Sequence, residues 1–143
     1  MKFWDASALL PLCLHEPHTL NLKRLSARDG AVVAWWGTAL ECYSALARLR
    51  REAALTSEDE TQARTLLHAL MAVWTEIEPS VVVREQAGRV LLLHPLRAAD
   101  AMQLAAAIVW ANGQATGHEF VCLDHRLREA AQREGFTILP KQL

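Results

Sequence analysis

Four acidic residues stand where the sequence pattern predicts the start of a helix, and their carboxylates offer the clearest chemistry in the chain: Asp5, Glu41, Asp100 and Asp124. Asp5 follows a short apolar run and precedes good helix formers, so it should lie between a strand and a helix. Asp124 follows the apolar segment 119–123 in the same way. In open α/β sheets, ligands bind outside the carboxyl ends of the strands. We therefore expect Asp5 and Asp124 to share a ligand-binding edge.

Three of these acids also have a structural explanation. Asp5 and Asp124 stand at strand-to-helix junctions, where an Asp commonly caps the helix by accepting a hydrogen bond from a free backbone N–H. Thr38 and Glu41 have the spacing of a capping box, in which Glu41 would accept a hydrogen bond from the backbone N–H of Thr38. Capping explains each of these acids on its own, and it leaves open whether the acids also form a ligand-binding site.

Asp100 is harder to explain by capping, because it is the only acid between residues 96 and 111, a mostly apolar stretch. An unpaired carboxylate on such a helix costs free energy unless it meets a cation or water. Arg97, one turn earlier, is a candidate partner. If the helix start that bears Glu41 and the two junction acids share one edge of the sheet, Asp100 can join them, and a single acidic site explains all four residues.

Clustered carboxylates repel one another and raise one another's pKa values unless cations lie between them. Oxygen ligands without a cluster of His or Cys favour a hard divalent cation, Mg²⁺ or Mn²⁺. The sequence has no Walker-type phosphate loop, no G-x-G-x-x-G after a strand and no Ser-His-Asp signature. A metal site without a nucleotide-binding loop favours hydrolysis of a phosphodiester by metal-activated water.

Size and composition are typical of one ordinary domain, so we expect a single domain over residues 1–143. About half of the residues are hydrophobic (52%), which argues against a disordered chain. Lys plus Arg (15) nearly balance Asp plus Glu (16), so the net charge of −1 does not by itself indicate nucleic acid. With no signal-peptide pattern and no membrane-length apolar run, we expect a cytoplasmic protein. Cys13, Cys42 and Cys122 lie in apolar segments, as buried reduced thiols do.

Short apolar runs alternate along the chain with segments of helical periodicity. The runs predict strands at 1–4, 31–36, 74–78, 119–123 and 136–139. The periodic segments predict helices at 6–14, 19–28, 38–54, 80–93, 96–111 and 124–134, with one more after the capping-box spacings at 56–60. This alternation predicts an α/β fold of three layers, with a short central parallel sheet flanked by helices on both faces.

Four motifs in this order resemble the PIN-domain family, and most of all the VapC-type toxin ribonucleases of bacterial type II toxin–antitoxin systems. The motifs are Phe3-Trp4-Asp5-Ala6-Ser7-Ala8-Leu9, Thr38-Ala39-Leu40-Glu41, Leu96-Arg97-Ala98-Ala99-Asp100-Ala101-Met102-Gln103-Leu104-Ala105 and Phe120-Val121-Cys122-Leu123-Asp124. The resemblance extends from end to end of the chain. It implies an endoribonuclease that depends on Mg²⁺ or Mn²⁺, is usually a homodimer, and is held inactive by a small antitoxin whose tail enters the site.

The resemblance also implies roles for individual residues. Asp5, Glu41, Asp100 and Asp124 match the family's acidic site residues, and we expect Asp5, Asp100 and Asp124 to hold the metal. Ser7 matches a hydroxyl residue that commonly follows the first Asp by two, and Thr38 matches a frequent Ser or Thr one turn ahead of the Glu. Both are expected to support the acids.

One position departs from the family pattern. Members often have Thr or Ser two residues before the last acid, where this chain has Cys122. A thiol hydrogen-bonds more weakly than a hydroxyl, so we do not expect Cys122 to support the site.

Several basic and aromatic residues are candidates for contacts with RNA. Arg97 and Arg126 are the candidates nearest the acids in sequence, and both could neutralise phosphates that flank the cut. Trp35 and Trp36 could stack on bases, although packing in the core or at a dimer interface is the commoner use of at least one. Further basic candidates are Lys23, Arg24, Arg48 and Arg51.

Three other functions fit parts of the pattern. A housekeeping PIN nuclease would keep the chemistry without an antitoxin, and a short open reading frame directly upstream would favour the toxin instead. A PIN-like module that only binds RNA or protein would need none of the four acids. A haloacid-dehalogenase-like phosphatase wants a second Asp two residues after the first, and Ser7 occupies that position.

Overall fold

The centre of the fold is a five-stranded sheet in which every neighbouring pair of strands is parallel, in the order β3-β2-β1-β4-β5. The strands are β1 (Lys2–Trp4), β2 (Val32–Trp35), β3 (Thr75–Ile77), β4 (Glu119–Val121) and β5 (Thr137–Leu139). The structure, a computed structural model, describes residues 1–143 except the side chain of residue 29. The expected α/β class with a short parallel sheet is confirmed.

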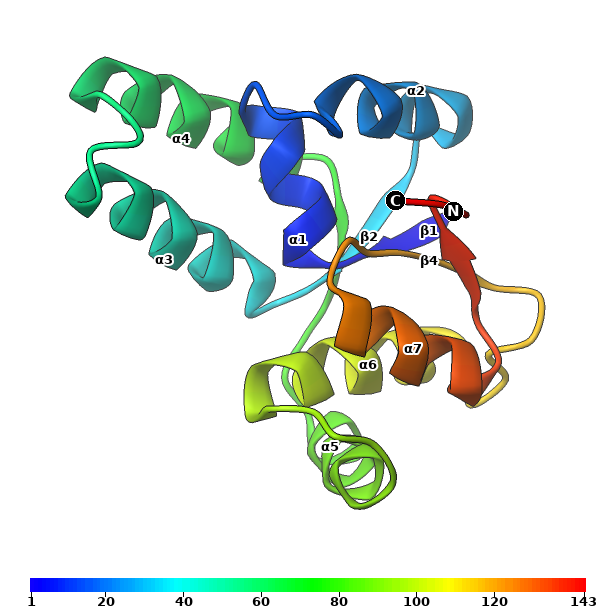
Figure 1. Cartoon of the computed structure of the whole chain (residues 1–143). Helices are drawn as coiled ribbons and strands as arrows, with labels where there is room; N and C mark the ends of the chain where they lie inside the picture. The colour runs from blue at the N-terminus through cyan, green and yellow to red at the C-terminus, as the bar shows by residue number, and fades with distance from the viewer.

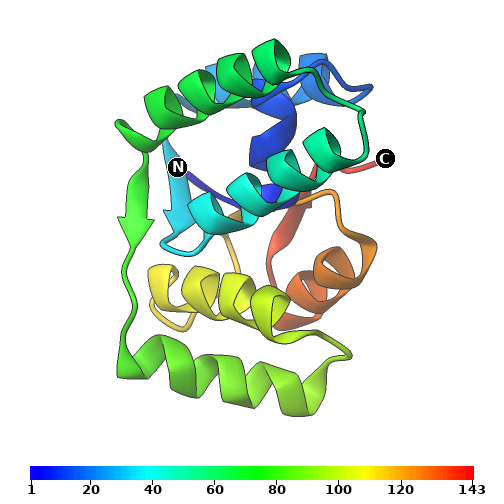
Figure 2. The same ribbon diagram turned by 90° about the vertical axis from the view of Figure 1, so that its left-hand side faces the viewer.

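Helices cover both faces of this sheet (Figures 1 and 2). They are α1 (Ala6–Leu9), the 3₁₀ helix η1 (Leu10–Cys13), α2 (Thr19–Asp29), α3 (Thr38–Arg51), α4 (Ser57–Met71), α5 (Val81–Leu93), α6 (Ala98–Trp110) and α7 (His125–Glu134). Helices α1 to α4 lie on one face, and α5 to α7 lie on the other. None of the described helices combines the length and apolar character needed to span a bilayer.

The two faces of the sheet build two apolar cores, because successive side chains of a strand point to opposite faces. Phe3 packs with α5, α6 and α7, whereas its neighbour Trp4 packs with α1, α3 and α4. In β4, Phe120 belongs to the same core as Phe3, and Val121 belongs to the same core as Trp4. The rings of Phe3 and Phe120 are stacked, with their centroids 5.2 Å apart. Strands buried on both faces explain the continuous apolar runs in the sequence.

Some helix boundaries differ from the sequence-based expectation. The first helix continues only as a 3₁₀ turn beyond Leu9, because Pro11 has no backbone N–H for an α-helical hydrogen bond. Helix α3 ends at Arg51, and Ala53 then takes a positive φ of 58°. The predicted capping box of α4 is confirmed, with Thr56 and Asp59 bonding each other's backbone N–H.

One polar cluster joins α5 to α7 away from the acids. Glu134 accepts hydrogen bonds from Arg89 and from His94, whose Nε2 lies 2.7 Å from Glu134 Oε2. Burial raises the pKa of Glu134, but the hydrogen bonds and the charges of Arg89 and His94 outweigh it, so the pKa lies below the ordinary value of 4.5. The cluster therefore stabilises the fold when Glu134 is ionised.

Replacing this carboxylate should destabilise the protein in a pH-dependent way. We expect Glu134→Gln to lower the free energy of unfolding by about 1–2 kcal/mol near pH 7, measured by urea denaturation. A lowered folded-state pKa means that the stabilisation is complete above pH 4.5 and fades as the pH falls through that pKa. Glu129→Gln, which removes an exposed ion pair with Arg133 on the same helix, should change little. Equal losses in both variants would contradict this role.

Candidate acidic site

The acidic residues meet because three parallel strands end at the same edge of the sheet. Asp5 directly follows β1, and its backbone N–H donates to Val121 O at 3.0 Å, at the end of β4. Glu41 lies in the first turn of α3, which follows β2, and Asp124 caps α7, which follows β4. Because β2, β1 and β4 are neighbours, the helix starts that follow them lie side by side (Figure 1).

Asp5 is the buried member of the set, with 4% of its surface exposed. Its Oδ2 accepts hydrogen bonds from both the backbone N–H and the hydroxyl of Ser7, so the capping explanation also holds. Burial raises the pKa of Asp5, in spite of the Ser7 hydrogen bonds, and the charge of Asp100 raises it further. Ser7 Oγ in turn accepts from Leu123 N at 2.9 Å, which ties Asp5 to the segment leading to Asp124.

Cys122 lies beside Asp5 rather than apart from it. Its Sγ is 3.6 Å from both Asp5 Oδ2 and Ser7 Oγ. Burial raises the pKa of the thiol, so Cys122 stays neutral and acts at most as a weak donor. All three cysteines are free and buried, as the sequence predicts.

Glu41 does not cap α3, so the capping-box explanation is wrong. Gly37 takes the N-cap position without a side-chain hydrogen bond, and Thr38 is already inside the helix. Glu41 Oε2 instead accepts from Gln103 Nε2 at 2.7 Å. Burial, followed by the charges of Asp5 and Asp100, raises the pKa of Glu41 to about 7, although the Gln103 hydrogen bond opposes this.

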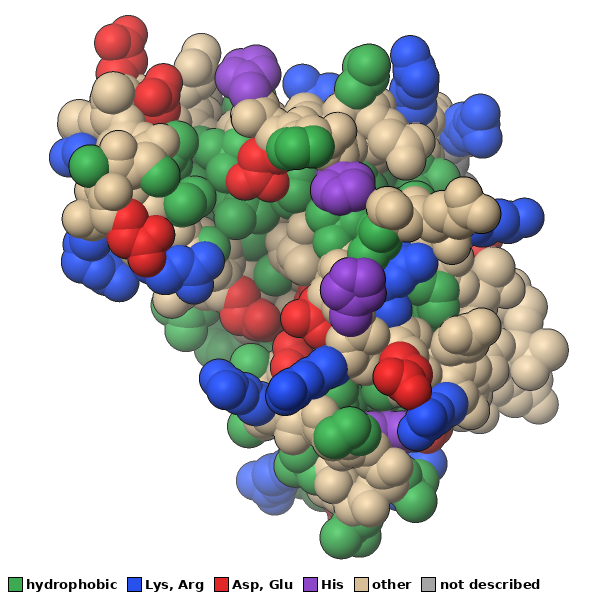
Figure 3. Space-filling model, viewed as in Figure 1, with side chains coloured by type: hydrophobic (Ala, Val, Ile, Leu, Met, Phe, Trp, Pro, Cys, Tyr) green, Lys and Arg blue, Asp and Glu red, His purple; other side chains and the backbone are tan. Residues whose placement is uncertain are grey.

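Asp100 and Asp124 form the more exposed half of the set. Burial and the nearby charge of Asp124 raise the pKa of Asp100, against a backbone hydrogen bond at Arg97 and the charges of Arg97 and Arg126. Asp124 Oδ1 accepts from Leu127 N at 2.9 Å, so this acid is also a helix cap, as the structural explanation predicts. Acidic side chains gather in the hollow of the surface in Figure 3, with Lys and Arg side chains beside them.

The charge of Asp100 thus acts on both Asp5 and Glu41, that of Asp5 acts on Glu41, and that of Asp124 acts on Asp100. No cation is among the causes that shift the pKa values of Asp5 and Glu41, whereas the charges of Arg97 and Arg126 lower that of Asp100. This donor set suits a hard cation. As the side chains stand, however, no three His, Cys, Asp or Glu residues among those described are arranged to hold a metal ion.

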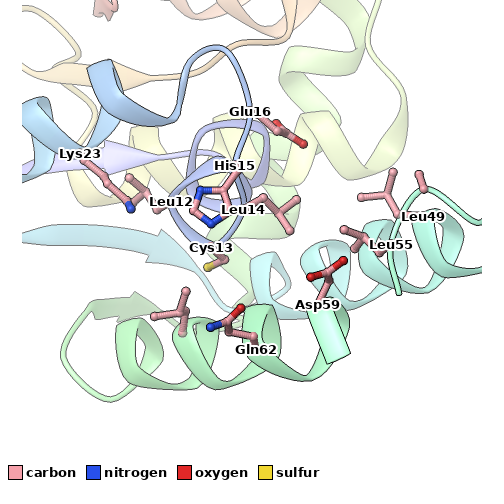
Figure 4. A pocket seen from close by; sticks show the side chains of 12 residues that line it. Leu12, Cys13, Leu14, His15, Glu16, Lys23, Leu49, Leu55, Asp59 and Gln62 are labelled. Atoms are coloured by element: carbon pink, nitrogen blue, oxygen red, sulfur yellow. The ribbon is translucent and has the colours of Figure 1, made fainter. Parts of the chain in front are cut away.

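One apolar cleft lies away from the acids. A cleft of about 550 Å³ opens between η1, the end of α3, and α4, with Leu12, Cys13 and Leu14 on one side and Gln62 on the other (Figure 4). None of the four acids lines it. We therefore place the chemistry at the acidic edge and not in this cleft.

One residue of the site was missed by sequence analysis. Gln103 is fully buried and hydrogen-bonds to both Glu41 and Thr38, so Thr38 lies in the same polar network as the acids. The available signal was its polar amide one turn after Asp100 in an otherwise apolar helix. Such a residue needs buried polar partners, as Asp100 needs a cation.

The raised pKa of Glu41 predicts how stability depends on pH without metal. Below pH 4.5 the carboxyl is protonated in both states, so it costs nothing. Between pH 4.5 and about 7 the unfolded chain ionises first, so the folded state loses stability as the pH rises. The free energy of unfolding of Glu41→Gln should therefore rise relative to that of the wild type over this range. The difference should be at most about 3 kcal/mol, and solvent screening of the carboxyl would make it smaller.

The measurement is urea denaturation in chelator at pH 5 and pH 8. Glu52→Gln, an exposed change beyond the other end of α3, should track the wild type at both values. If the difference between Glu41→Gln and the wild type were the same at pH 5 and pH 8, burial of an ionised Glu41 would be disproved.

Comparison with known proteins reveals relatives along the whole chain. No family model matches the sequence. Ribonuclease VapC45 of Mycobacterium tuberculosis strain CDC 1551 / Oshkosh and ribonuclease VapC49 of strain ATCC 25618 / H37Rv are each 28% identical over 143 residues. Each alignment covers 100% of this chain and 97% of the relative.

A solved structure shares the fold. The crystal structure of M. tuberculosis VapC20, a toxin that cleaves the sarcin-ricin loop, superposes with a TM-score of 0.66 at 19% sequence identity. The match covers 96% of this chain and 97% of VapC20. The resemblance seen in the four motifs thus extends to relatives aligned along the whole chain and to the fold.

Proposed function

We propose that this protein is an endoribonuclease that depends on Mg²⁺ or Mn²⁺ and serves as the toxin of a VapBC-type toxin–antitoxin pair. The observation that carries the proposal is the meeting of Asp5, Glu41, Asp100 and Asp124 at one edge of the sheet. Two full-length relatives are named ribonucleases, which supports the same activity here.

Asp5, Asp100 and Asp124 are the residues that would hold the divalent cation. Their carboxylate oxygens are the ligands such ions prefer, and the raised pKa values of Asp5 and Asp100 indicate a site that gains from added positive charge. When bound, a divalent cation supplies an activated water and stabilises negative charge on the leaving oxygen. Ser7 supports the site by fixing the orientation of the Asp5 carboxylate.

Glu41 is suited to accept a proton. A carboxylate with a pKa near the working pH is an efficient general base, and the pKa of Glu41 is raised to about 7. We assign Glu41 the role of general base, which accepts a proton from the attacking water. Its hydrogen bond from Gln103 holds one of its oxygens in place during this step.

We assign contacts with the RNA backbone to Arg97 and Arg126. Both are exposed and both act electrostatically on Asp100, so a phosphate beside the acids would lie near them. Trp35 and Trp36 were both candidates for stacking on bases. Trp35 is 6% exposed and belongs to the core, whereas Trp36 is 53% exposed. Trp36 directly follows β2 and is available to stack on an unpaired base.

The proposal includes two protein partners. The VapC names of the relatives support a small antitoxin, and the family resemblance supports a homodimer. Helix α5 offers a surface for a second copy, because it exposes Val81, Val82, Leu92 and Leu93.

Removal of one metal-site carboxylate should abolish cleavage. We expect Asp100→Asn to slow cleavage of RNA by purified protein in Mg²⁺ by about 100-fold or more, because the site loses a charge it needs in the transition state. Chelator should stop the wild type. Glu129→Gln, which alters an exposed acid on α7, should retain full activity.

The same variants test the biological role. Induced wild type should arrest growth and create new RNA 5′ ends, detected by sequencing, whereas Asp100→Asn should do neither. Undiminished, chelator-sensitive cleavage by a folded Asp100→Asn protein would refute the assignment of the site.

A further inference from the structure

We propose that Gln103 is a positioning residue that links the first turns of α3 and α6 across the edge of the sheet and thereby holds Glu41 in the acidic site. This inference rests on the proposed ribonuclease function. Nothing in the four sequence motifs assigns the role, since it arises from contacts between residues more than 60 positions apart.

Both hydrogens of the Gln103 amide are used. Nε2 donates to Thr38 Oγ1 at 2.8 Å and to Glu41 Oε2 at 2.7 Å. Gln103 and Thr38 are each 0% exposed and Glu41 is half-buried, so the amide donates from a site that water does not reach. In such a dry environment, a hydrogen bond to an ionised carboxylate is strong and fixes its geometry.

The network joins two layers of the fold. Helices α3 and α6 lie on opposite faces of the sheet (Figures 1 and 2). Thr38 and Glu41 are one turn apart on α3, and Asp100 and Gln103 are one turn apart on α6, so each pair shares a helix face. Gln103 therefore fixes the helix that carries Asp100 against the helix that carries Glu41.

Such a link is needed because the groups it joins repel. The charges of Asp5 and Asp100 both act against ionised Glu41, which favours separation of the two helix starts. A neutral amide can hold Glu41 without placing a positive charge in the site. A Lys or Arg at this position would itself occupy the space that we assign to a cation.

This arrangement leaves one atom of the amide without a hydrogen bond. Gln103 Oε1 is buried and has no hydrogen-bond partner in the described part of the chain. The reverse orientation of the amide would bring Oε1 against the Glu41 carboxylate, so the ionised acid imposes the orientation observed. An apolar side chain of the same shape, such as Met, would remove this unsatisfied atom but would leave Thr38 Oγ1 and Glu41 Oε2 without their donor.

The test uses Gln103→Met, which keeps the shape and removes the donor. We expect a lower melting temperature, because Thr38 and Glu41 lose a buried donor, together with a fall in kcat of about 10-fold or more and a KM for RNA within about two-fold. The lower limb of the pH–rate profile should move to higher pH, because Glu41 loses a hydrogen bond that favours its ionised form. A merely structural role would leave that limb in place.

A second readout needs neither metal nor catalysis. In metal-free protein, a ¹³C NMR titration of the Glu41 carboxyl should show a higher midpoint in Gln103→Met than in the wild type. An unchanged midpoint in a folded variant would overturn the inference, and so would unchanged kcat. If the wild type itself cleaves no RNA, the proposed function falls, and the titration still decides the role of Gln103.

A charge-swapped pair covers the case in which Gln103→Met does not fold. Gln103→Glu places two carboxyls together and should lower the melting temperature at pH 8. Adding Glu41→Gln restores a donor and an acceptor in reversed order, so the double variant should regain most of the loss. A double variant no more stable than Gln103→Glu would contradict the hydrogen bond at the centre of the inference.

Discussion

Repulsion between like charges is the constraint on which the arrangement of this protein depends. Three parallel strands deliver carboxylates to one edge of the sheet, where burial and mutual charge raise the pKa values of Asp5, Glu41 and Asp100. The fold resists this repulsion with neutral donors. Ser7 holds Asp5, backbone N–H groups hold the caps, and Gln103 holds Glu41. Neutral groups thus hold these acids together at one edge of the sheet.

Capping and the acidic site prove to be compatible for two of the acids. Asp5 and Asp124 each cap a helix at the edge of the sheet where the other acids lie, so a local folding role does not exclude a role in the site. Glu41 has no such local role, because Gly37 begins α3. Its hydrogen bond comes instead from Gln103 in a distant part of the chain.

Much of this could be predicted from the sequence. Apolar runs ending at Asp5 and Asp124 indicated the strands, helical periodicity indicated the crossovers, and together they predicted a parallel sheet. The capping box at Thr56 was predicted correctly because its contacts are local. The box at Thr38 was predicted wrongly, since its spacing cannot reveal that Gln103 donates to both Thr38 and Glu41 from another layer of the fold. Sequence spacing and periodicity do not reveal contacts between segments that lie far apart in the chain.

The most direct measurement of the central claim is the position of a bound ion. Crystals grown with Mn²⁺ should give an anomalous difference peak at the acidic edge, bounded by the carboxylates of Asp5, Asp100 and Asp124 and absent from crystals of Asp100→Asn. No peak at saturating Mn²⁺, or a peak away from these carboxylates, would contradict the account.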